Sequence, residues 1–284
     1  MEVPDLVSLV ITTYNRSDAL LAVLSALTRQ SDRNFEVIVA DDGSRDEHRL
    51  AILQSVVAKA LKAVHVWHPD VGFTASKVRN RGVGCARGNY IVFLDGDCVP
   101  ENDFVARHRA LAEPGCFVNG SRVLLSPGLT KRVVNGQDIV DGRGPGFWLG
   151  KRLSGEASKL TGLVRLPDGA YRVHAKFSWR GIRSCNMAVW RRDFEGVDGF
   201  DESFVGWGHE DADFVLRLHN LGIARKDGFC ATEVFHLWHR EASRSQESEN
   251  ARTVALRATT DVTRPTLGYA RLRENDDVVL TRTG

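Results

Sequence analysis

The chain has 284 residues, of which 43% are hydrophobic and 26% are charged, so it is long enough to bury a core without disulfides or a structural metal. Its 38 basic and 36 acidic residues nearly balance, which argues against a general nucleic-acid binder. The five cysteines form no CxxC pair and no apolar run reaches the ~18–20 residues of a membrane span, so we expect a reduced, cytoplasmic protein without a transmembrane segment.

The first hundred residues alternate between strand and helix patterns. Apolar, β-branched runs predict strands over residues 7–11, 35–40, 64–67 and 90–94. Apolar residues at helical spacing predict a helix after each of the first three strands, the third over about 74–86. This order predicts an α/β fold with a mostly parallel sheet and helices on both of its faces.

The second half of the chain has a different character. Residues 126–180 are rich in glycine and basic side chains and show no clear element, so we expect a functional or partly mobile loop region there. Strands are predicted over 184–189 and 229–235, with a helix between them that follows Gly206-Trp207-Gly208. The tail from about residue 243 is polar and basic and carries a weak helical pattern.

Polar clusters follow three of the predicted strands, at residues 12–16, 41–44 and 95–97. In an open α/β sheet, ligands bind beyond the carboxyl ends of the strands. Because the ends of parallel strands meet at one edge of the sheet, we expect the three clusters to share one crevice.

The cluster Asp95-Gly96-Asp97 indicates a metal site. Two carboxylates can hold a hard divalent cation, and the glycine between them lets a ligand approach closely. An isolated Asp-Gly pair is also a common surface turn. The buried strand that precedes this pair and the neighbouring clusters favour a Mn²⁺ or Mg²⁺ site.

Two histidines are placed to complete that site. His236 and His239 lie at the end of the last predicted strand, and a neutral imidazole is a common ligand of Mn²⁺. Most of the nine histidines are expected to be packed or surface residues instead. Position alone favours His236, His239 or both as ligands.

Charged residues elsewhere predict a base and a phosphate contact. Glu210 and Asp211 begin a predicted helix, whose dipole stabilises their ionised forms, and a carboxylate held so can act as a general base. Acidic residues in a first helical turn are also common as simple caps. Arg79, on the helix before the Asp95 strand, can pair with the carboxylates or with a diphosphate, or lie on a solvated helix face.

Together these motifs resemble a known enzyme family. The runs VSLVITTYNR, FEVIVADDGS and KVRNRGVGCARGNYIVFLDGD resemble the nucleotide-sugar-binding half of family 2 glycosyltransferases with the GT-A fold. The later run CNMAVWRRDFEGVDGFDESFVGWGHEDADFVLRLHNLG is similar to the galactosyltransferase-type carboxy-terminal module. The resemblance covers about residues 5–125 and 180–240.

The resemblance implies a single compact catalytic domain with a Rossmann-like GT-A sheet. Residues 1–125 would be the nucleotide-sugar-binding half, 126–242 the acceptor-binding catalytic half, and 243–284 a tail or extension. The implied reaction is inverting transfer of a hexose or N-acetylhexosamine from a UDP-sugar to an acceptor hydroxyl, with Mn²⁺ or Mg²⁺. The acceptor stays open between a glycan, a lipid-linked saccharide, a peptide and a small natural product, and the inner membrane face stays open as a peripheral location.

The resemblance also assigns roles by position. The nucleotide-sugar site would include Thr12, Tyr14 and Arg16 at the nucleoside, Asp41 or Asp42 at the uracil, Arg79 at the phosphates, Asp95 near the ribose or metal, and Gly96, Asn186 and Trp207. The metal ligands would be Asp97, His239, His236 and Asp95, with Asp211 as the general base and Glu210 as its acceptor-binding partner.

Two departures and two alternatives accompany this interpretation. Ala212 stands where the galactosyltransferases carry a third acidic residue, and His209 replaces a small residue, so the acceptor pocket differs from theirs. The same sheet could serve a nucleotidyltransferase, but the first strand is followed by Thr-Thr-Tyr-Asn-Arg rather than a glycine-rich, lysine-containing loop. A non-catalytic sugar-nucleotide-binding module would be expected to lack Asp211 or the paired aspartates, and both are present.

Overall fold

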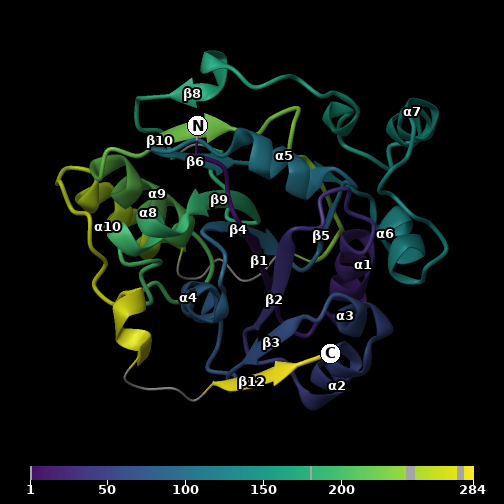
Figure 1. Ribbon diagram of the computed structural model, residues 1–284, viewed down its shortest axis with the longest axis horizontal. Helices are drawn as coiled ribbons and strands as arrows, with labels where there is room; N and C mark the ends of the chain where they lie inside the picture. The colour runs from purple at the N-terminus through teal and green to yellow at the C-terminus, as the bar shows by residue number, and fades with distance from the viewer. Residues whose placement is uncertain (1, 180, 241–246, 274–277) are drawn as a thin grey trace.

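Four buried parallel strands form the centre of the protein. The computed structural model describes residues 2–179, 181–240, 247–273 and 278–284 (Figure 1). The order β3-β2-β1-β4 is parallel throughout, as the sequence predicts, and the strands are mostly apolar because both of their faces are covered. The four central strands are β1 (Val7–Thr13), β2 (Phe35–Asp41), β3 (Val64–Trp67) and β4 (Tyr90–Asp95).

Helices cover both faces of this sheet, as predicted. One core cluster joins Leu9 and Ile11 of β1 to Leu24 of helix α1, and a second joins Val10 of the same strand to Phe214 of α9. This alternation follows from the strand geometry, in which successive side chains point to opposite faces. The helices are α1 (Ser17–Leu27), α2 (Asp46–Gln54), α3 (Val56–Ala60), α4 (Ala75–Cys85), α5 (Phe104–Leu111), α6 (Pro127–Val134), α7 (Pro145–Leu153), α8 (Arg191–Gly196), α9 (Glu210–Asn220) and α10 (Glu247–Arg257).

Beyond β4 the sheet becomes mixed, so the parallel arrangement holds only for its amino-terminal half. The full order is β12-β3-β2-β1-β4-β9-β6-β10-β8, in which β9 runs antiparallel to both of its neighbours. The register of β4 with β9 sets Leu94 opposite Asn186, which brings the residues before β9 to the end of β4. The additional strands of this sheet are β6 (Cys116–Asn119), β8 (Val173–His174), β9 (Asn186–Trp190), β10 (Ala224–Asp227) and β12 (Val279–Arg282).

A second, three-stranded sheet lies beyond the end of β4. It consists of β5 (Cys98–Pro100), β11 (Val234–His236) and β7 (Arg122–Leu124), in the order β5-β11-β7. The antiparallel register of β11 with β5 sets His236 opposite Cys98, directly after Asp97. This small sheet therefore positions the candidate metal ligands.

Two expectations for the second half are wrong. Of the strand expected over 229–235, only the last two residues are in a strand, β11, because the preceding residues form a turn in which Cys230 takes a positive φ of 54°. The irregular region expected over 126–180 contains α6 and α7. Ion pairs stabilise this region, with Arg132 bound to Asp138 at 2.8 Å and to Glu156 at 2.6 Å.

Within the described ranges, none of the helices has the length and hydropathy needed to cross a bilayer.

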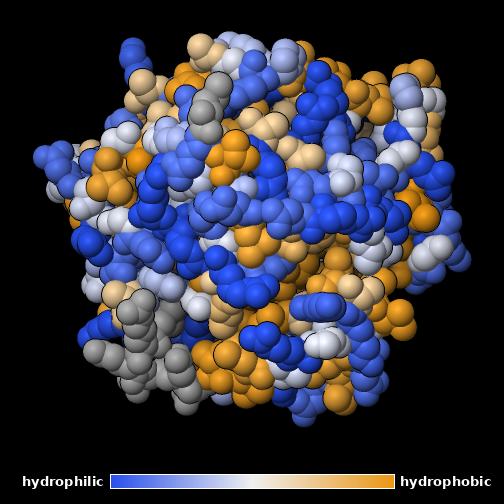
Figure 2. Space-filling view, in the orientation of Figure 1, coloured by the Kyte–Doolittle hydropathy of each residue, from blue (hydrophilic) through white to orange (hydrophobic). Residues whose placement is uncertain are grey.

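The carboxy-terminal tail is part of the folded body. Helix α10 confirms the weak helical pattern, and β12 pairs antiparallel with β3 and gives the sheet a new edge. Figure 2 shows a hydrophobic area at the lower side of this face, where Figure 1 draws β12, and Val279 and Leu280 are exposed there. Residues 243–246 and 274–277 of the tail lie outside the described residues.

Helix α10 stabilises α9 and the segment before it through ion pairs with buried aspartates. Arg257 binds Asp213 at 2.6 Å and Asp201 at 2.8 Å, and both aspartates are fully buried. Asn250 donates from Nδ2 to the carbonyl oxygen of Gly208 at 2.9 Å. The tail thus supports the Gly206-Trp207-Gly208 turn from outside.

We expect Arg257→Met to destabilise the protein by about 3 kcal/mol, because it leaves two buried carboxylates without this cation. Urea unfolding followed by tryptophan fluorescence measures the change. Arg252→Met, at an exposed position of the same helix, is the matched control and should leave the free energy of unfolding nearly unchanged. Equal midpoints for the two variants would contradict this role of α10.

Candidate functional site

Two of the predicted strand-end clusters meet as expected. Thr12 and Asp95 are partners in the register of β1 and β4, and the Thr12 hydroxyl donates to Asp95 Oδ1 at 2.8 Å. The backbone N–H of Gly96 donates to the Thr12 carbonyl oxygen at 2.7 Å. A Cβ atom at Gly96 would lie 2.8 Å from that oxygen, so the turn between the two aspartates requires glycine.

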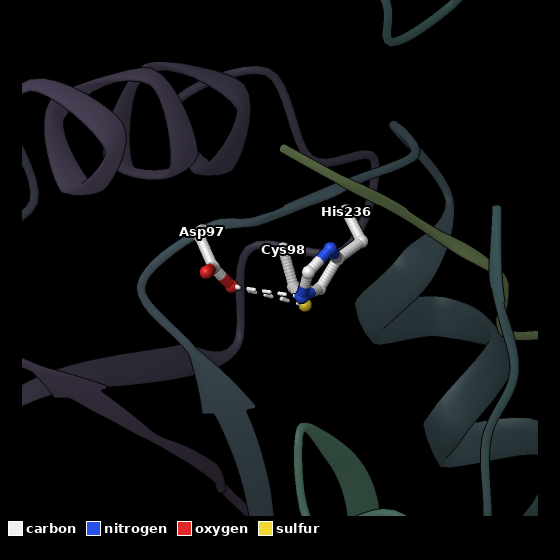
Figure 3. Close-up of side chains that lie close together, drawn as sticks. All are labelled: Asp97, Cys98 and His236. Atoms are coloured by element: carbon white, nitrogen blue, oxygen red, sulfur yellow. Dashed lines mark hydrogen bonds and ion pairs between the residues drawn. The ribbon is translucent and has the colours of Figure 1, made fainter. Parts of the chain in front are cut away.

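Asp97 faces both predicted histidines. Its Oδ2 lies 3.3 Å from His239 Nε2, and its Oδ1 lies 3.7 Å from His236 Nε2. Figure 3 shows Asp97 and His236 pointing toward one another, with Cys98 beside them. The backbone N–H of Leu237 donates to the Asp97 carbonyl oxygen at 2.8 Å, which ties the two segments together. Asp97, Cys98 and His236 are close enough to hold one ion.

The donor set fits a divalent cation such as Mn²⁺ or Mg²⁺. Burial raises the pKa of Asp97 and lowers that of His236. The lowered pKa of His236 favours the neutral imidazole, which is the form that binds a cation. His239 Nδ1 lies 2.8 Å from the Arg240 carbonyl oxygen, which sets Nδ1 as the donor and leaves Nε2 free to ligate. Burial raises the pKa of the Cys98 thiol, so it stays protonated and is a poor ligand.

A buried arginine joins this group to the predicted base. Arg79 is only 4% exposed and reaches Asp95 Oδ1 at 3.3 Å through Nη2 and Glu210 Oε1 at 3.2 Å through Nη1. Burial lowers the pKa of Arg79, but the charges of Asp95 and Glu210 more than offset this, and the pKa is raised overall. Arg79 is therefore a fixed cation between the two halves of the chain.

Asp211, the candidate base, has a raised pKa. Burial and the neighbouring charge of Glu210 raise its pKa to about 7, and Arg79 partly opposes this. The backbone N–H of Ala212 donates to Asp211 Oδ1 at 2.8 Å, so the side chain caps its own helix as well. The chain reaches α9 through a tight turn in which Gly206, Gly208 and His209 all have positive φ.

The residues predicted to contact the nucleoside are only partly arranged as expected. Tyr14 is 47% exposed and donates to Asp70 Oδ2 at 2.9 Å. Arg16 forms an ion pair with Asp18 at 3.0 Å. Asp70 follows the end of β3, so the strand-end rule could have found it, and sequence reasoning missed it. Both Asp41 and Asp42 are buried.

Asp41 and Asp42 each have protein partners. Asp41 lies 2.9 Å from His65 and accepts from the backbone N–H of Ser44 at 2.8 Å. Asp42 accepts from the backbone N–H of Thr74 at 2.9 Å and contacts His68. In this structure both carboxylates therefore bind neighbouring protein groups at the end of β2.

Asn186 lies beneath the site rather than in it. It is 1% exposed, its Oδ1 lies 3.1 Å from His108 Nε2, and its Nδ2 donates to the Ser121 carbonyl oxygen at 3.0 Å. Burial lowers the pKa of His108 to about 4, so this partner is neutral. We therefore leave Asn186 out of the proposed donor site. Trp207, in contrast, is 36% exposed and accessible to a ligand.

Comparisons with known proteins agree with this geometry. The sequence model of glycosyl transferase family 2 matches residues 8–162, and that described as the N-terminal domain of galactosyltransferase matches residues 165–240. Validoxylamine A glucosyltransferase of Streptomyces hygroscopicus subsp. jinggangensis (strain 5008) is 30% identical over 230 residues, which are 77% of this chain and 52% of that protein. Hyaluronan synthase of Pasteurella multocida is 30% identical over 287 residues, which are 92% of this chain and 27% of that protein.

Solved structures share the fold. The mannosyltransferase PcManGT from Pyrobaculum calidifontis, in complex with GDP-Man and Mn²⁺, has a TM-score of 0.60 at 16% identity and covers 91% of this chain and 65% of its own. GalNAc-T7 with UDP, GalNAc and Mn²⁺ has a TM-score of 0.60 at 14% identity and covers 88% of this chain and 47% of its own. The protein has the GT-A fold and belongs to glycosyl transferase family 2. The chain spans about half or less of the length of these two curated relatives.

We expect Gly96→Ala to destabilise the protein by about 1–3 kcal/mol, because the new methyl group clashes with the Thr12 carbonyl oxygen. Urea unfolding measures the change. Gly150→Ala is the matched control, since a Cβ atom there meets nothing within 4 Å and alanine favours the helix in which it lies. A Gly96 variant as stable as the control would contradict the close approach.

The raised pKa of Asp211 predicts a pH-dependent cost to stability. Between the ordinary aspartate pKa of about 4 and the folded value of about 7, the folded protein binds a proton that the unfolded chain releases. The free energy of unfolding of the wild type, relative to Asp211→Asn, should therefore fall as pH rises from about 4 to 7 and then level off. Denaturant titrations at several pH values in EDTA measure this. Asp46→Asn, in the first turn of α2 with a side chain 85% exposed, is the control, and a pH-independent difference for Asp211 would refute the prediction.

Proposed function

We propose that this glycosyltransferase moves a hexose or N-acetylhexosamine from a UDP-sugar to an acceptor hydroxyl, with inversion at the anomeric carbon and with the help of a divalent cation. The observation that carries the proposal is the bridge of Arg79 between Asp95 and Glu210. It supports the proposal because one buried cation contacts both the aspartate turn and the first residue of the helix that carries the candidate base.

Orphaned polar atoms support a ligand in this crevice. Arg79 Nε and Glu210 Oε2 are buried and have no hydrogen-bond partner in the described structure. A buried polar group without a partner costs free energy, so such atoms indicate a missing ligand. A diphosphate oxygen suits Arg79 and an acceptor hydroxyl suits Glu210.

Each group then has a role in the reaction. A Mn²⁺ or Mg²⁺ ion held by Asp97, His236 and His239 would neutralise charge on the departing diphosphate. Arg79 adds a fixed positive charge on the same side. Asp211 accepts the proton of the acceptor hydroxyl as its oxygen bonds to the anomeric carbon, while the bond to the UDP oxygen breaks on the opposite face.

The relatives support sugar-nucleotide chemistry but differ in what they act on. One solved structure holds GDP-Man and the other UDP with GalNAc, both with Mn²⁺. We keep a UDP-sugar as the proposed donor. The class of acceptor stays open between a glycan, a lipid-linked saccharide, a peptide and a small natural product. The unpaired state of all five cysteines supports a reducing compartment, and we propose the cytoplasm.

The test is UDP release from a panel of UDP-sugars with Mn²⁺ and candidate acceptors, with UDP affinity measured in parallel. Asp211→Asn should lower turnover about 10²–10⁴-fold and leave the Kd for UDP unchanged. Asp97→Asn should abolish the Mn²⁺-dependent part of UDP binding. Turnover of the wild type should fall as pH drops below about 7, where Asp211 becomes protonated.

Glu195→Gln, an exposed position on α8, which follows the end of β9 that pairs with Tyr90 rather than with Leu94, is the control and should behave as the wild type. Wild-type turnover in Asp211→Asn would remove it as the base. Release of pyrophosphate in place of UDP, or binding without turnover for every donor, would refute the proposed reaction.

A further inference from the structure

Three basic side chains of the segment 126–183 form ion pairs within the described part of the protein. Arg132 and Lys151 share Asp138 and Glu156, and Lys151 lies 2.9 Å from the latter. Arg165, further along, binds Asp103 at 3.0 Å. The segment is therefore less cationic than its sequence indicates, and the basic residues without such partners stand out.

Three cations beside the crevice form what we call the cation cluster, consisting of Arg122, Lys159 and Arg183. Arg122 Nη1 lies 3.8 Å from Cys185 Sγ, and Lys159 Nζ donates to Ser121 Oγ at 2.7 Å. Within the part of the chain that the structure describes, none of the three forms an ion pair with a carboxylate.

The members of the cluster repel one another. Burial lowers the pKa of Lys159, and although Glu233 opposes this, Arg183 and Arg122 lower it further. Glu233, whose charge acts on Lys159, is only 1% exposed, and burial raises its pKa. An anion from outside would offset the repulsion among the three cations.

The cluster lies next to the segment that precedes β9. Arg183 and Cys185 flank Ser184, whose backbone hydrogen bond helps to lower the pKa of Asp211, and the Cys185 carbonyl oxygen accepts from the Asp95 N–H at 3.2 Å. Arg122 comes from β7, which pairs with β11 of the candidate metal site, and its Nη1 contacts Cys185. The cluster therefore lies beside both the aspartate turn and the candidate base.

We propose that the cation cluster is an anion subsite for the acceptor, which takes a carboxylate or phosphate group carried close to the reacting hydroxyl. The inference rests on the proposed function, since it assumes that an acceptor enters beside Asp211. Arg122 and Arg183 offer guanidinium groups that bind such anions through two parallel hydrogen bonds, and Lys159 adds a point charge. The proposal leaves the donor diphosphate to Arg79 and the candidate metal ligands.

Matched pairs of sugars test the proposal without requiring turnover. The probes are p-nitrophenyl β-D-glucuronide against p-nitrophenyl β-D-glucoside, and glucose 6-phosphate against glucose. Their Kd values are measured by NMR titration, with and without UDP and Mn²⁺. We expect the anionic member of at least one pair to bind about tenfold more tightly or better, and the preference to shrink as salt is added. Which pair shows it distinguishes a carboxylate from a phosphate.

The variants are Arg183→Gln alone, at an exposed position, and Arg122→Gln/Lys159→Gln/Arg183→Gln together. The single variant should reduce the preference and the triple variant should remove it, with the Kd for UDP unchanged. Lys131→Gln/Arg152→Gln, two exposed cations outside the cluster, is the control and should keep the preference. Melting temperatures show whether each variant is folded.

Equal affinity of wild type for the neutral and anionic probes would overturn the subsite, as would a preference that survives in the single variant and a folded triple variant. A triple variant that loses UDP affinity would instead assign the cluster to the donor diphosphate. These results are separate from a failure of the proposed function, which would appear as no Mn²⁺-dependent UDP binding by the wild type in the same titrations.

Discussion

The arrangement of the site depends on one buried guanidinium. Arg79 lies on α4 between Asp95, at the end of a central strand, and Glu210, at the start of α9. Removing such a cation would leave carboxylates facing one another in a place that excludes water. The ion pairs of Arg79 therefore hold together two parts of the chain that are 131 residues apart, the aspartate turn and the start of α9.

Strand direction decides what gathers around that arginine. Because β9 runs antiparallel to β4, the residues before β9 arrive beside Asp95, whose backbone N–H donates to the Cys185 carbonyl oxygen at 3.2 Å. The antiparallel pairing of β11 with β5 likewise brings His236 to Asp97. The metal ligands, the backbone support of Asp211 and the cation cluster all follow from these two pairings.

The carboxy-terminal tail contributes rigidity where function needs it. The turn before α9 contains three residues with positive φ, a conformation that costs free energy for His209 in particular. Asn250 and Arg257 of α10 hold this turn and the buried aspartates beneath it. The structure that presents Glu210 and Asp211 thus depends on the last 40 residues of the chain as well as on its own sequence.

The sequence by itself determined the features that are local. Apolar runs predicted the four central strands, and polar residues at the strand ends predicted a crevice. Both features could be predicted because each depends only on residues that are neighbours in the sequence. It also predicted that Asp97 would share a site with His236 and His239, and the structure brings these three side chains together. Only the tertiary structure decided the reversal of β9, the burial of Asn186 and which of the described cations form ion pairs. Those outcomes depend on contacts between segments that are distant in the sequence. A local sequence pattern does not specify which distant residue a side chain will contact.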